Sequence, residues 1–550
     1  MSFPYFYEKN NYVLDNPKIN ITFEELLWMN EDEFQKWIDV MREGILYSWD
    51  TFGCPLKSGL TEEEIISQFS ELVDVPLMMK NRNDISDVSL KKSAFETNDL
   101  LDETGKTIVV QNIQRDGSAV DQFFPTMMKT RINYSKKDNG YSVYDLFADV
   151  KKRQKLVTIS RKCLKKDSFY YFSQTVTKEK NSNVTGVEWL EKFVNTKKDN
   201  FDFWIDGKKK NRIKKISTGY TQIESDSQLS LTKDEILNCM IDGIILPKHI
   251  TTLHQPLSDD YVYYIRTFQI GKKLFPHAFK AYRIGDIQIA VNFPPMTAKF
   301  LVQKYTSHIN DQDEIIWYDS SAGWGGRILG AMAYLRDGVK LHYVGNDPNP
   351  DNYVESVGKS RYEILADFFN ANIKHNRMSV VLGTEPINTF EIFREGSETI
   401  GDNVNFQKYK GKLDFVFTSP PYFAKEAYND ADTQSYKKFN QYELWREGFL
   451  RPTLTTAVEY LKHDRYLVWN IADVQFDGEW LPLVQDSVKI LESLGMKIIN
   501  VNKMALMNMP GQNRIGENGV PTSGSYAKIV NSRGVEEYVK TEPFIVAYKE

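Results

Sequence analysis

The spacing of hydrophobic residues changes along the chain and predicts distinct regions. Near the N-terminus, hydrophobic residues recur at helical spacing, and the pattern Thr22 with Glu25 is typical of a helix start. From about residue 105, short β-branched and aromatic runs predict strands: KTIVVQNI, YSVYDLF, KLVTIS and SFYYFSQTV. We therefore expect a helical region over 1–104 and a mixed α/β region over 105–284.

From residue 285, buried strands alternate with helices. The stretches that predict strands are DEIIWYDSS, LHYVGNDPNP, MSVVLG, KLDFVFTSPPYF, RYLVWNIADV, MKIINVNKMALMN and EPFIVAYK. Alternation of this kind predicts a mostly parallel sheet with helices on both faces. Ligands on such sheets lie beyond the carboxyl ends of the strands, so residues just after each strand are candidates for a site.

Size and composition indicate a globular protein of several domains. The chain has 550 residues, of which 41% are hydrophobic and 26% charged. This balance is ordinary for a globular protein, and the length allows a large hydrophobic core. No apolar run approaches the ~18 residues of a membrane span, and we find no secretory signal. The 3 cysteines lie far apart, in neither metal-ligand nor disulfide spacing. We expect no metal, no membrane and a cytoplasmic location.

One segment carries a strong positive charge within an acidic protein. Residues 151–215 contain 19 lysines and arginines against 7 acidic residues, whereas the whole chain has a net charge of −5. Three consecutive lysines, Lys208, Lys209 and Lys210, lie close to Trp204 in the sequence. Lysines neutralise phosphates, and aromatic rings stack on bases. We expect this region to bind DNA and recognise the target; a structural appendage or a module for a protein partner is the alternative.

A glycine-rich turn follows the strand DEIIWYDSS. The sequence DSSAGWGG begins at Asp319, and Gly323 and Gly325 allow a tight turn and the close approach of a ligand to backbone N–H groups. The next strand ends near Asp347, where a carboxylate is placed to accept hydrogen bonds from two ribose hydroxyls. The turn lacks a phosphate-binding Gly-Lys-Ser/Thr ending, so we expect a nucleoside without phosphates. Packing of the turn and a capping role for Asp347 are the structural alternatives.

Two prolines form a rigid corner at the end of another strand, in the sequence FTSPPYF. This corner, Ser419-Pro420-Pro421-Tyr422, together with the glycine turn before it, resembles the S-adenosylmethionine-dependent DNA amino-methyltransferases, which methylate cytosine N4 or adenine N6. The stretch NFPPMTAKFLVQKYT is similar to the helix that this family packs over its cofactor. The resemblance covers about 285–550 and implies a Rossmann-like methyltransferase domain with a seven-stranded, mostly parallel sheet.

The resemblance also implies a cofactor, S-adenosylmethionine, and the residues of a site. The positions that correspond to cofactor-binding residues are Phe293, Pro294, Asp319, Ser320, Ala322, Gly323, Gly325, Asp347 and Glu385. At the catalytic corner, the Ser419 hydroxyl and the Pro420 carbonyl are expected to accept hydrogen bonds from the amino group of a base, which frees the nitrogen lone pair. Pro421 stiffens the corner, Tyr422 stacks on a base swung out of the duplex, and Phe423 lines the same pocket.

The identity of the methylated atom follows from the first residue of the corner. Within the family, Ser-Pro-Pro is more typical of the cytosine-N4 enzymes and Asp-Pro-Pro of the adenine-N6 enzymes, so we expect cytosine N4, with adenine N6 as the alternative. Methylation at cytosine C5 needs a thiolate, and residues 285–550 contain no cysteine. DNA is the expected partner; the sequence specifies neither an oligomeric state nor a restriction endonuclease partner.

Other activities share these motifs. Amino-methyltransferases that act on RNA or protein often carry Asn-Pro-Pro-Tyr, and Ser419 argues against them. A non-catalytic nucleic-acid-binding protein with a decayed methyltransferase domain is a further alternative, because Ser320 and Ser321 replace the Pro-Phe pair of the family. A nicotinamide oxidoreductase fits less well, because Ile328 breaks the Gly-x-Gly-x-x-Gly register.

Overall fold

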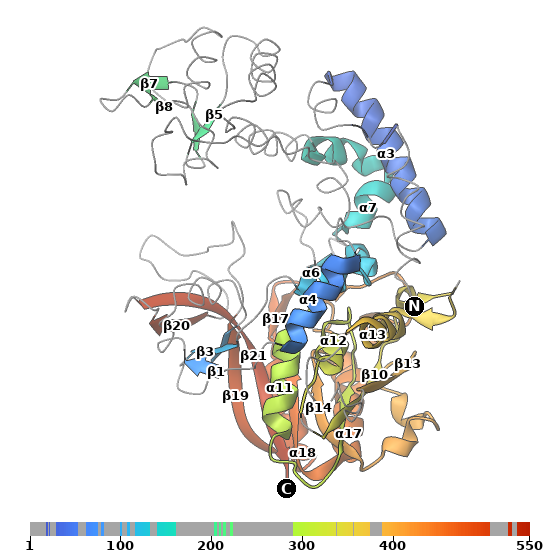
Figure 1. Cartoon of the computed structure of the whole chain (residues 1–550), viewed down its shortest axis with the longest axis vertical. Helices are drawn as coiled ribbons and strands as arrows, with labels where there is room; N and C mark the ends of the chain where they lie inside the picture. Colours follow the sequence, from blue (N-terminus) through green and yellow to red (C-terminus); the bar gives the residue numbers. More distant parts are fainter. Residues whose placement is uncertain are drawn as a thin grey trace. The chain divides into compact units, whose positions relative to one another are not determined.

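The computed structural model of the chain contains a large sheet with helices packed against it (Figure 1). The structure describes residues 18–19, 21, 29–52, 62–74, 79–81, 99–101, 107–110, 116–132, 140–160, 203–205, 208–210, 213–215, 221–223, 290–336, 338–355, 357–373, 388–505, 526–530 and 536–550.

Contacts divide the chain into two compact units, each built from separate stretches of sequence. The first unit comprises Met1–Lys9, Trp49–Asp145 and Ile287–Glu550, and the second comprises Asn10–Ser48 and Leu146–Asp286. The unit that carries the glycine turn and the two-proline corner therefore includes sequence from both sides of the basic segment. The predicted domain boundaries at residues 104 and 284 stay predictions.

The sheet of the first unit contains the predicted seven-stranded core. Its order is β13-β10-β9-β14-β16-β21-β19, and all neighbours pair in parallel except β21, which is antiparallel to both β16 and β19. The strands are β9 (Glu314–Asp319), β10 (Lys340–Asn346), β13 (Thr389–Phe393), β14 (Leu413–Thr418), β16 (Leu461–Asn470), β19 (Lys497–Ala505) and β21 (Glu536–Lys549). The prediction of a seven-stranded, mostly parallel, Rossmann-like sheet is confirmed.

The sheet extends beyond this core into sequence that we assigned to other regions. Strands β2 (Asp99–Leu101), β3 (Thr107–Val110) and β1 (Met79–Asn81) continue it in antiparallel order from β19. β20 (Tyr526–Val530) pairs with β21. The predicted strand KTIVVQNI thus contains β3, and it belongs to the same sheet as the candidate site. The predicted strands MSVVLG and SFYYFSQTV lie outside the described residues.

Two groups of helices pack against the core strands. The first group comprises α11 (Pro295–Thr306), α12 (Gly326–Met332) and α13 (Arg361–Asn372), which contact one another in chain order. The second comprises α17 (Arg451–Tyr460) and α18 (Leu483–Ser493), which also contact each other. Helices α12, α13 and α17 each lie between two of the predicted strands, and α18 follows the strand RYLVWNIADV, as the predicted alternation requires. Helix α11 lies within NFPPMTAKFLVQKYT, the stretch that resembles the family's helix.

Side chains on β14 alternate between these two groups of helices. Phe415 stacks on Tyr305 of α11, with ring centroids 6.3 Å apart. Val416 instead joins a buried cluster that includes Leu454 of α17 and Leu491 of α18. Every residue of β14 is buried, as expected for a central parallel strand covered on both faces.

Two segments that we expected to be strands are helical. YSVYDLF contains α7 (Val143–Ala148), and KLVTIS lies within a helix that covers residues 153–160. Ser142 caps α7: its hydroxyl accepts a hydrogen bond from the Asp145 N–H at 3.1 Å, and the Asp145 carboxylate accepts one from the Ser142 N–H at 2.7 Å. This capping box stabilises a helix start and outweighs the β propensity of the aromatic residues.

The N-terminal helices agree in place with the prediction but differ in their starts. α3 (Glu31–Phe52) begins after Asn30, whose side chain accepts a hydrogen bond from the Glu33 N–H at 3.0 Å. The predicted start at Thr22 lies outside the described residues. Within the second unit, Arg153 binds Asp39 of α3 through two nitrogens, at 2.5 and 2.7 Å.

Candidate active site

The glycine turn and the two-proline corner follow neighbouring parallel strands. β9 ends at Asp319 and β14 ends at Thr418, and Tyr318 lies opposite Val416 in the register. From β9 the chain continues to β10 on one side, while β14 lies on the other side, so the strand order reverses between β9 and β14. Ligands of open α/β sheets bind at such a switch point. The two motifs therefore share the edge of the sheet at which a site is expected.

Three glycines shape the turn after β9. Gly323 and Gly325 have φ angles of +64° and +81°, in the left-handed region that favours glycine. A Cβ atom at Gly325 would lie 2.3 Å from the ring of Phe124, and one at Gly326 would lie 2.0 Å from the carbonyl oxygen of Phe293. The turn is thus packed between residue 124, which comes from the N-terminal part of the unit, and the segment that leads into α11.

A buried ion pair holds the turn in shape. The carboxylate of Asp319 accepts hydrogen bonds from Arg327 Nε at 2.8 Å and from the Tyr343 hydroxyl at 2.7 Å. Arg327 also donates to the carbonyl oxygen of Ser321. Burial opposes the charge of Arg327, but the neighbouring Asp319 keeps the pKa of the guanidinium above its usual value. Asp319, a predicted cofactor-binding residue, is fully buried and acts on the turn through Arg327, which the sequence analysis missed.

Asp347 follows β10 and already has several partners. Its two oxygens accept hydrogen bonds from the backbone N–H groups of Asn349 at 2.9 Å and Gly323 at 3.1 Å, while the nearby Tyr362 hydroxyl donates to the carbonyl oxygen of Gly323. Burial raises the pKa of Asp347 to about 6, although the hydrogen bonds that it accepts favour its charged form. A carboxylate offers about four acceptor positions. Asp347 therefore keeps capacity for at least one ligand hydroxyl.

Two buried hydroxyls at this edge have no hydrogen-bond partner among the described residues: Ser320 Oγ, just after β9, and Thr418 Oγ1, at the end of β14. A buried hydroxyl without a partner costs about 1–3 kcal/mol, and such groups are rare in folded proteins. The N–H of Ala322, by contrast, donates to the Asn346 carbonyl at 3.0 Å. A polar ligand group that reached Ser320 or Thr418 would relieve this cost.

Phe293 and Pro294 lie directly against the turn, at the start of α11. The ring of Phe293 packs edge-on against Phe417 of β14, with centroids 5.2 Å apart. The Asn292 amide donates to the carbonyl oxygen of Trp324 at 2.7 Å. This segment therefore touches both the glycine turn and the strand that leads to the corner, as the family resemblance implied for a helix packed beside the cofactor.

The corner is connected by hydrogen bonds to β16 and β21. Ser419 Oγ lies 3.2 Å from the Tyr422 hydroxyl, which donates to the carboxylate of Glu542 and lies 3.2 Å from the carbonyl oxygen of Asn470. The Asn470 amide donates to the same Glu542 oxygen at 3.2 Å. Burial, with Glu542 alongside, raises the pKa of Tyr422 far above its usual value, so the phenol stays protonated. Sequence reasoning missed Asn470 and Glu542.

Phe423 belongs to the core, contrary to the expectation that it lines the substrate pocket. Its side chain is only 2% exposed, and its ring packs 5.1 Å from Phe476 and 5.8 Å from Trp445. Its φ of +53° places it in the left-handed region directly after the corner. A buried aromatic that anchors the corner explains this residue without any contact to a substrate. Of the corner itself, Pro420 is buried, whereas Ser419 and Pro421 are half-buried.

A segment outside the family resemblance packs on the cofactor end of the site. η2 (Pro125–Lys129) contacts the loop after β10, where the Thr126 hydroxyl donates to Asn352 at 2.7 Å and Lys129 pairs with Asp351 at 3.2 Å. The next strand, β4 (Arg131–Ile132), pairs antiparallel with β15 (Glu426–Ala427), which follows the corner. Residues 124–132, which we predicted to belong to a separate region, therefore pack against the turn, the loop and the strand that surround the candidate site.

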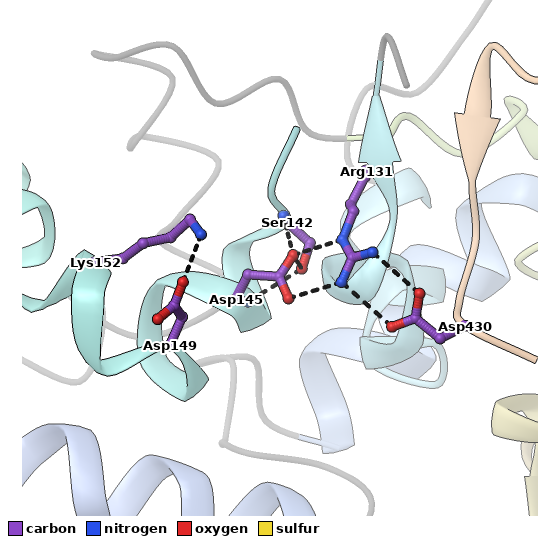
Figure 2. A network of polar contacts seen from close by, with 6 residues as sticks. All are labelled: Arg131, Ser142, Asp145, Asp149, Lys152 and Asp430. Carbon is purple, nitrogen blue, oxygen red and sulfur yellow. Dashed lines mark hydrogen bonds and ion pairs between the residues drawn. The ribbon is translucent and has the colours of Figure 1, made fainter. Parts of the chain in front are cut away.

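Arg131 joins this segment to the loop after the corner, as Figure 2 shows. Its guanidinium binds both oxygens of Asp145, at 2.8 and 3.1 Å, and both oxygens of Asp430, at 3.0 and 3.3 Å. Burial opposes the charge of Asp145, but hydrogen bonds from Arg131 and Ser142 hold its pKa below the usual range. Arg131 therefore links β4 to Asp145 of α7 and to Asp430 of the 424–430 loop.

The remaining predicted site residues lie away from the glycine turn and the corner in the sequence, or outside the described residues. Glu385 lies outside the described residues. Lys208, Lys209 and Lys210 form strand β6 in the second unit, where Trp204 of β5 (Phe203–Ile205) lies opposite Lys209. Among the described residues, no group of three or more His, Cys, Asp or Glu side chains is arranged to hold a metal. No helix in the described ranges combines the length and apolar character of a membrane span.

Comparison with known proteins gives matches only among solved structures. No protein-family model and no curated protein matches the sequence. The YcgJ protein from Bacillus subtilis is 11% identical; the match covers 46% of this chain and 99% of that chain, with a TM-score of 0.24. A SAM-dependent methyltransferase from Methanosarcina mazei is also 11% identical; the match covers 45% of this chain and 96% of that chain, with a TM-score of 0.23. Geranyl diphosphate methyltransferase in complex with GPP and sinefungin is 11% identical; the match covers 46% of this chain and 78% of that chain, with a TM-score of 0.23. The fold assignment therefore depends on the strand order given above.

Proposed function

We propose that the chain is an S-adenosylmethionine-dependent DNA methyltransferase that modifies the exocyclic amino group of a base, with cytosine N4 as the preferred atom. The observation that carries the proposal is the position of two motifs at the switch point of the sheet: the glycine turn after β9 and Ser419-Pro420-Pro421-Tyr422 after β14. A cofactor on the turn and an amino group at the corner would be direct neighbours.

The residues around the turn suit a nucleoside cofactor. Asp347 keeps one acceptor position for a ribose hydroxyl, and Ser320 Oγ is a buried polar group without a partner among the described residues. A Cβ atom at Gly323 would lie in ordinary van der Waals contact with Arg327, at 3.4 Å. Phe293 supplies an apolar surface next to the turn. S-adenosylmethionine, when bound there, supplies an electrophilic methyl group on a sulfonium.

The corner supplies what an amino group of a base needs before it can react. The nitrogen lone pair of such a group is delocalised into the ring, and acceptors for its N–H bonds make it available. Ser419 Oγ and the Pro420 carbonyl are these acceptors, and the two prolines leave the corner little conformational freedom to lose. Tyr422, fixed at its hydroxyl by Glu542, has its ring held in one orientation, which suits stacking on a flipped base.

DNA is the proposed acceptor because a base must leave its duplex to reach such a corner and because the second unit carries the lysine-rich strand β6. Ser419 in place of an aspartate favours cytosine N4 over adenine N6. Amino groups in RNA or on a protein side chain are chemically similar, so the experiment must include them.

A labelled-methyl assay tests the proposal. The full chain is incubated with radiolabelled S-adenosylmethionine and, in parallel, with unmethylated mixed-sequence DNA, RNA and protein, and the modified nucleoside or residue is then identified. We expect N4-methylcytosine in DNA. Ser419→Ala should lower the rate about 100-fold or more by removing an acceptor, whereas Ser307→Ala, an exposed serine after α11, should have no effect.

Calorimetry with S-adenosylmethionine separates an inactive domain from a wrong acceptor. Binding without methylation of any of the three acceptors would leave a nucleic-acid-binding protein with a decayed catalytic domain as the better interpretation. N6-methyladenine in place of N4-methylcytosine would reverse the choice of base, and label in RNA or protein alone would reverse the choice of acceptor.

A further inference from the structure

The hydrogen bonds around Tyr422 have one consistent direction. The Tyr422 hydroxyl faces two groups that only accept hydrogen bonds, the Glu542 carboxylate and, at 3.2 Å, the Asn470 carbonyl, so it is the donor toward both. A hydroxyl has a single proton to donate. Tyr422 must therefore act as acceptor toward Ser419, and the Ser419 hydroxyl donates to Tyr422 across 3.2 Å.

This direction has a consequence for Ser419. Because its own proton points toward Tyr422, the lone pairs of Ser419 Oγ are left for another donor, such as the N–H of an amino group. Asn470 fixes the Glu542 end of this series of hydrogen bonds, because its side-chain amide donates to Glu542 at 3.2 Å and to the Pro543 carbonyl at 3.0 Å. Ser419, Tyr422 and Glu542 thus form an ordered line of hydrogen bonds that runs from the corner to β21.

We propose that this line is a proton relay, in which Glu542 takes up, through Tyr422 and Ser419, the proton that the amino group loses when it is methylated. The proposal rests on the function proposed above. Glu542 acts through two other side chains and is a positioning residue, whereas Ser419 is the catalytic residue that touches the amino group.

The proton balance of the relay is complete. When the nitrogen forms its bond to the methyl group, and the methyl group leaves its sulfonium donor as a neutral thioether, the nitrogen becomes cationic and must lose one proton. That proton passes to Ser419 Oγ while the Ser419 proton passes to the Tyr422 oxygen and the Tyr422 proton passes to the Glu542 carboxylate. Glu542 then releases one proton to water, and each hydroxyl ends with one proton, as it began.

Other charged groups face Glu542 and must be controlled for. Glu426 of β15 is close enough to interact electrostatically with both Tyr422 and Glu542, and burial raises its pKa. Lys425 opposes that rise. Glu426 is therefore the group most easily confused with Glu542 in a pH profile, and it makes the matched control.

The first test is the pH dependence of a single turnover on unmethylated mixed-sequence DNA. In the wild type, the rate should fall as pH is lowered and Glu542 becomes protonated. Glu542→Gln keeps the shape and an acceptor for Tyr422, yet it should lower the rate about 100-fold and abolish this acid limb. Tyr422→Phe should have the same effect, and the double variant should be no slower than either single one. Glu426→Gln should retain the acid limb.

The second test needs no turnover. Infrared spectra of the free protein, titrated with acid, should show the band of a protonated carboxyl group with the same midpoint as the kinetic limb. The component of this band that titrates with the kinetic midpoint should be lost in Glu542→Gln and persist in Glu426→Gln. Calorimetry should show that Glu542→Gln binds S-adenosylmethionine as tightly as the wild type. Weaker binding would instead indicate that Glu542 has a purely structural role.

The outcomes distinguish the relay from the activity. An acid limb that survives in Glu542→Gln, or a double variant whose losses multiply, overturns the relay and leaves the methyltransferase intact. A wild type that methylates none of DNA, RNA and protein overturns both. Loss of the limb together with the matching infrared midpoint supports the relay.

Discussion

Arg131 should stabilise the first unit mainly through Asp145, which belongs to the same N-terminal segment, and only weakly through Asp430, which lies in the loop after the corner. Arg131 and Asp145 are 22% and 18% exposed, whereas Asp430 is 76% exposed. Two sets of variants test this difference: Arg131→Ala with Asp145→Asn, and Arg131→Ala with Asp430→Asn. Each set gives a double-mutant cycle, from which the coupling free energy of one pair is obtained.

The expected magnitudes follow from exposure. A partly buried, two-pronged pair between a guanidinium and a carboxylate contributes more than a neutral hydrogen bond, and we expect a coupling of about 2 kcal/mol for Arg131 with Asp145. Solvent screens the pair with Asp430, so its coupling should be about 0.5 kcal/mol or less. The Asp145 pair should therefore account for most of the stability that Arg131→Ala removes.

Urea unfolding followed by tryptophan fluorescence measures these couplings at pH 7 and again in acid. The pKa of Asp145 is lowered in the folded protein, so its contribution is present above the unfolded value of about 3.9 and is lost as pH falls through the lower, folded value. Equal couplings for Asp145 and Asp430, or a coupling for Asp145 that persists after it is protonated, would refute the argument from burial.

Three further predictions test other parts of the site. Protonation of Asp347, whose pKa burial raises to about 6, should weaken S-adenosylmethionine binding up to tenfold per pH unit below that value; calorimetry should show this slope in the wild type and none in Asp347→Asn. Gly326→Ala should destabilise the protein by about 2 kcal/mol or more, because its Cβ would lie 2.0 Å from the Phe293 carbonyl oxygen; a midpoint of urea unfolding like that of the wild type would contradict this packing. Replacing all three lysines of β6 (Lys208–Lys210) with glutamine should weaken DNA binding and reduce its salt slope by up to about 3, and an unchanged affinity across a salt series would argue against a DNA-binding role for this strand.

The fold was predictable where the chemistry is local. The alternation of strands and helices identified the core strands except β13 (Thr389–Phe393), which matched no predicted strand, and the two prolines after β14 marked the corner from the local sequence alone. The helix at α7 could also have been predicted, since Ser142 and Asp145 form a capping box in the sequence. We gave the aromatic residues between them more weight than the cap, and the prediction failed for that reason.

The partners of the site were not predictable in the same way, because they come from distant parts of the chain. Glu542 lies 120 residues beyond Tyr422, and Asp430 lies 299 residues beyond Arg131. Neither carboxylate has a local pattern that distinguishes it from the many exposed acids. Arg327 is the exception, because a lone arginine within the first turn of an otherwise apolar helix suggests a buried partner.

Because β2 pairs with β19, the sheet cannot be completed until late in the translation of the chain. Leu101 finds its neighbour Lys503 only after about 400 further residues have been made. The larger stretch of the second unit, Leu146–Asp286, lies between these two strands in the sequence, so it is synthesised before β2 can pair with β19. Unpaired strands invite aggregation, so newly made chains should depend on chaperones until translation reaches the final strands.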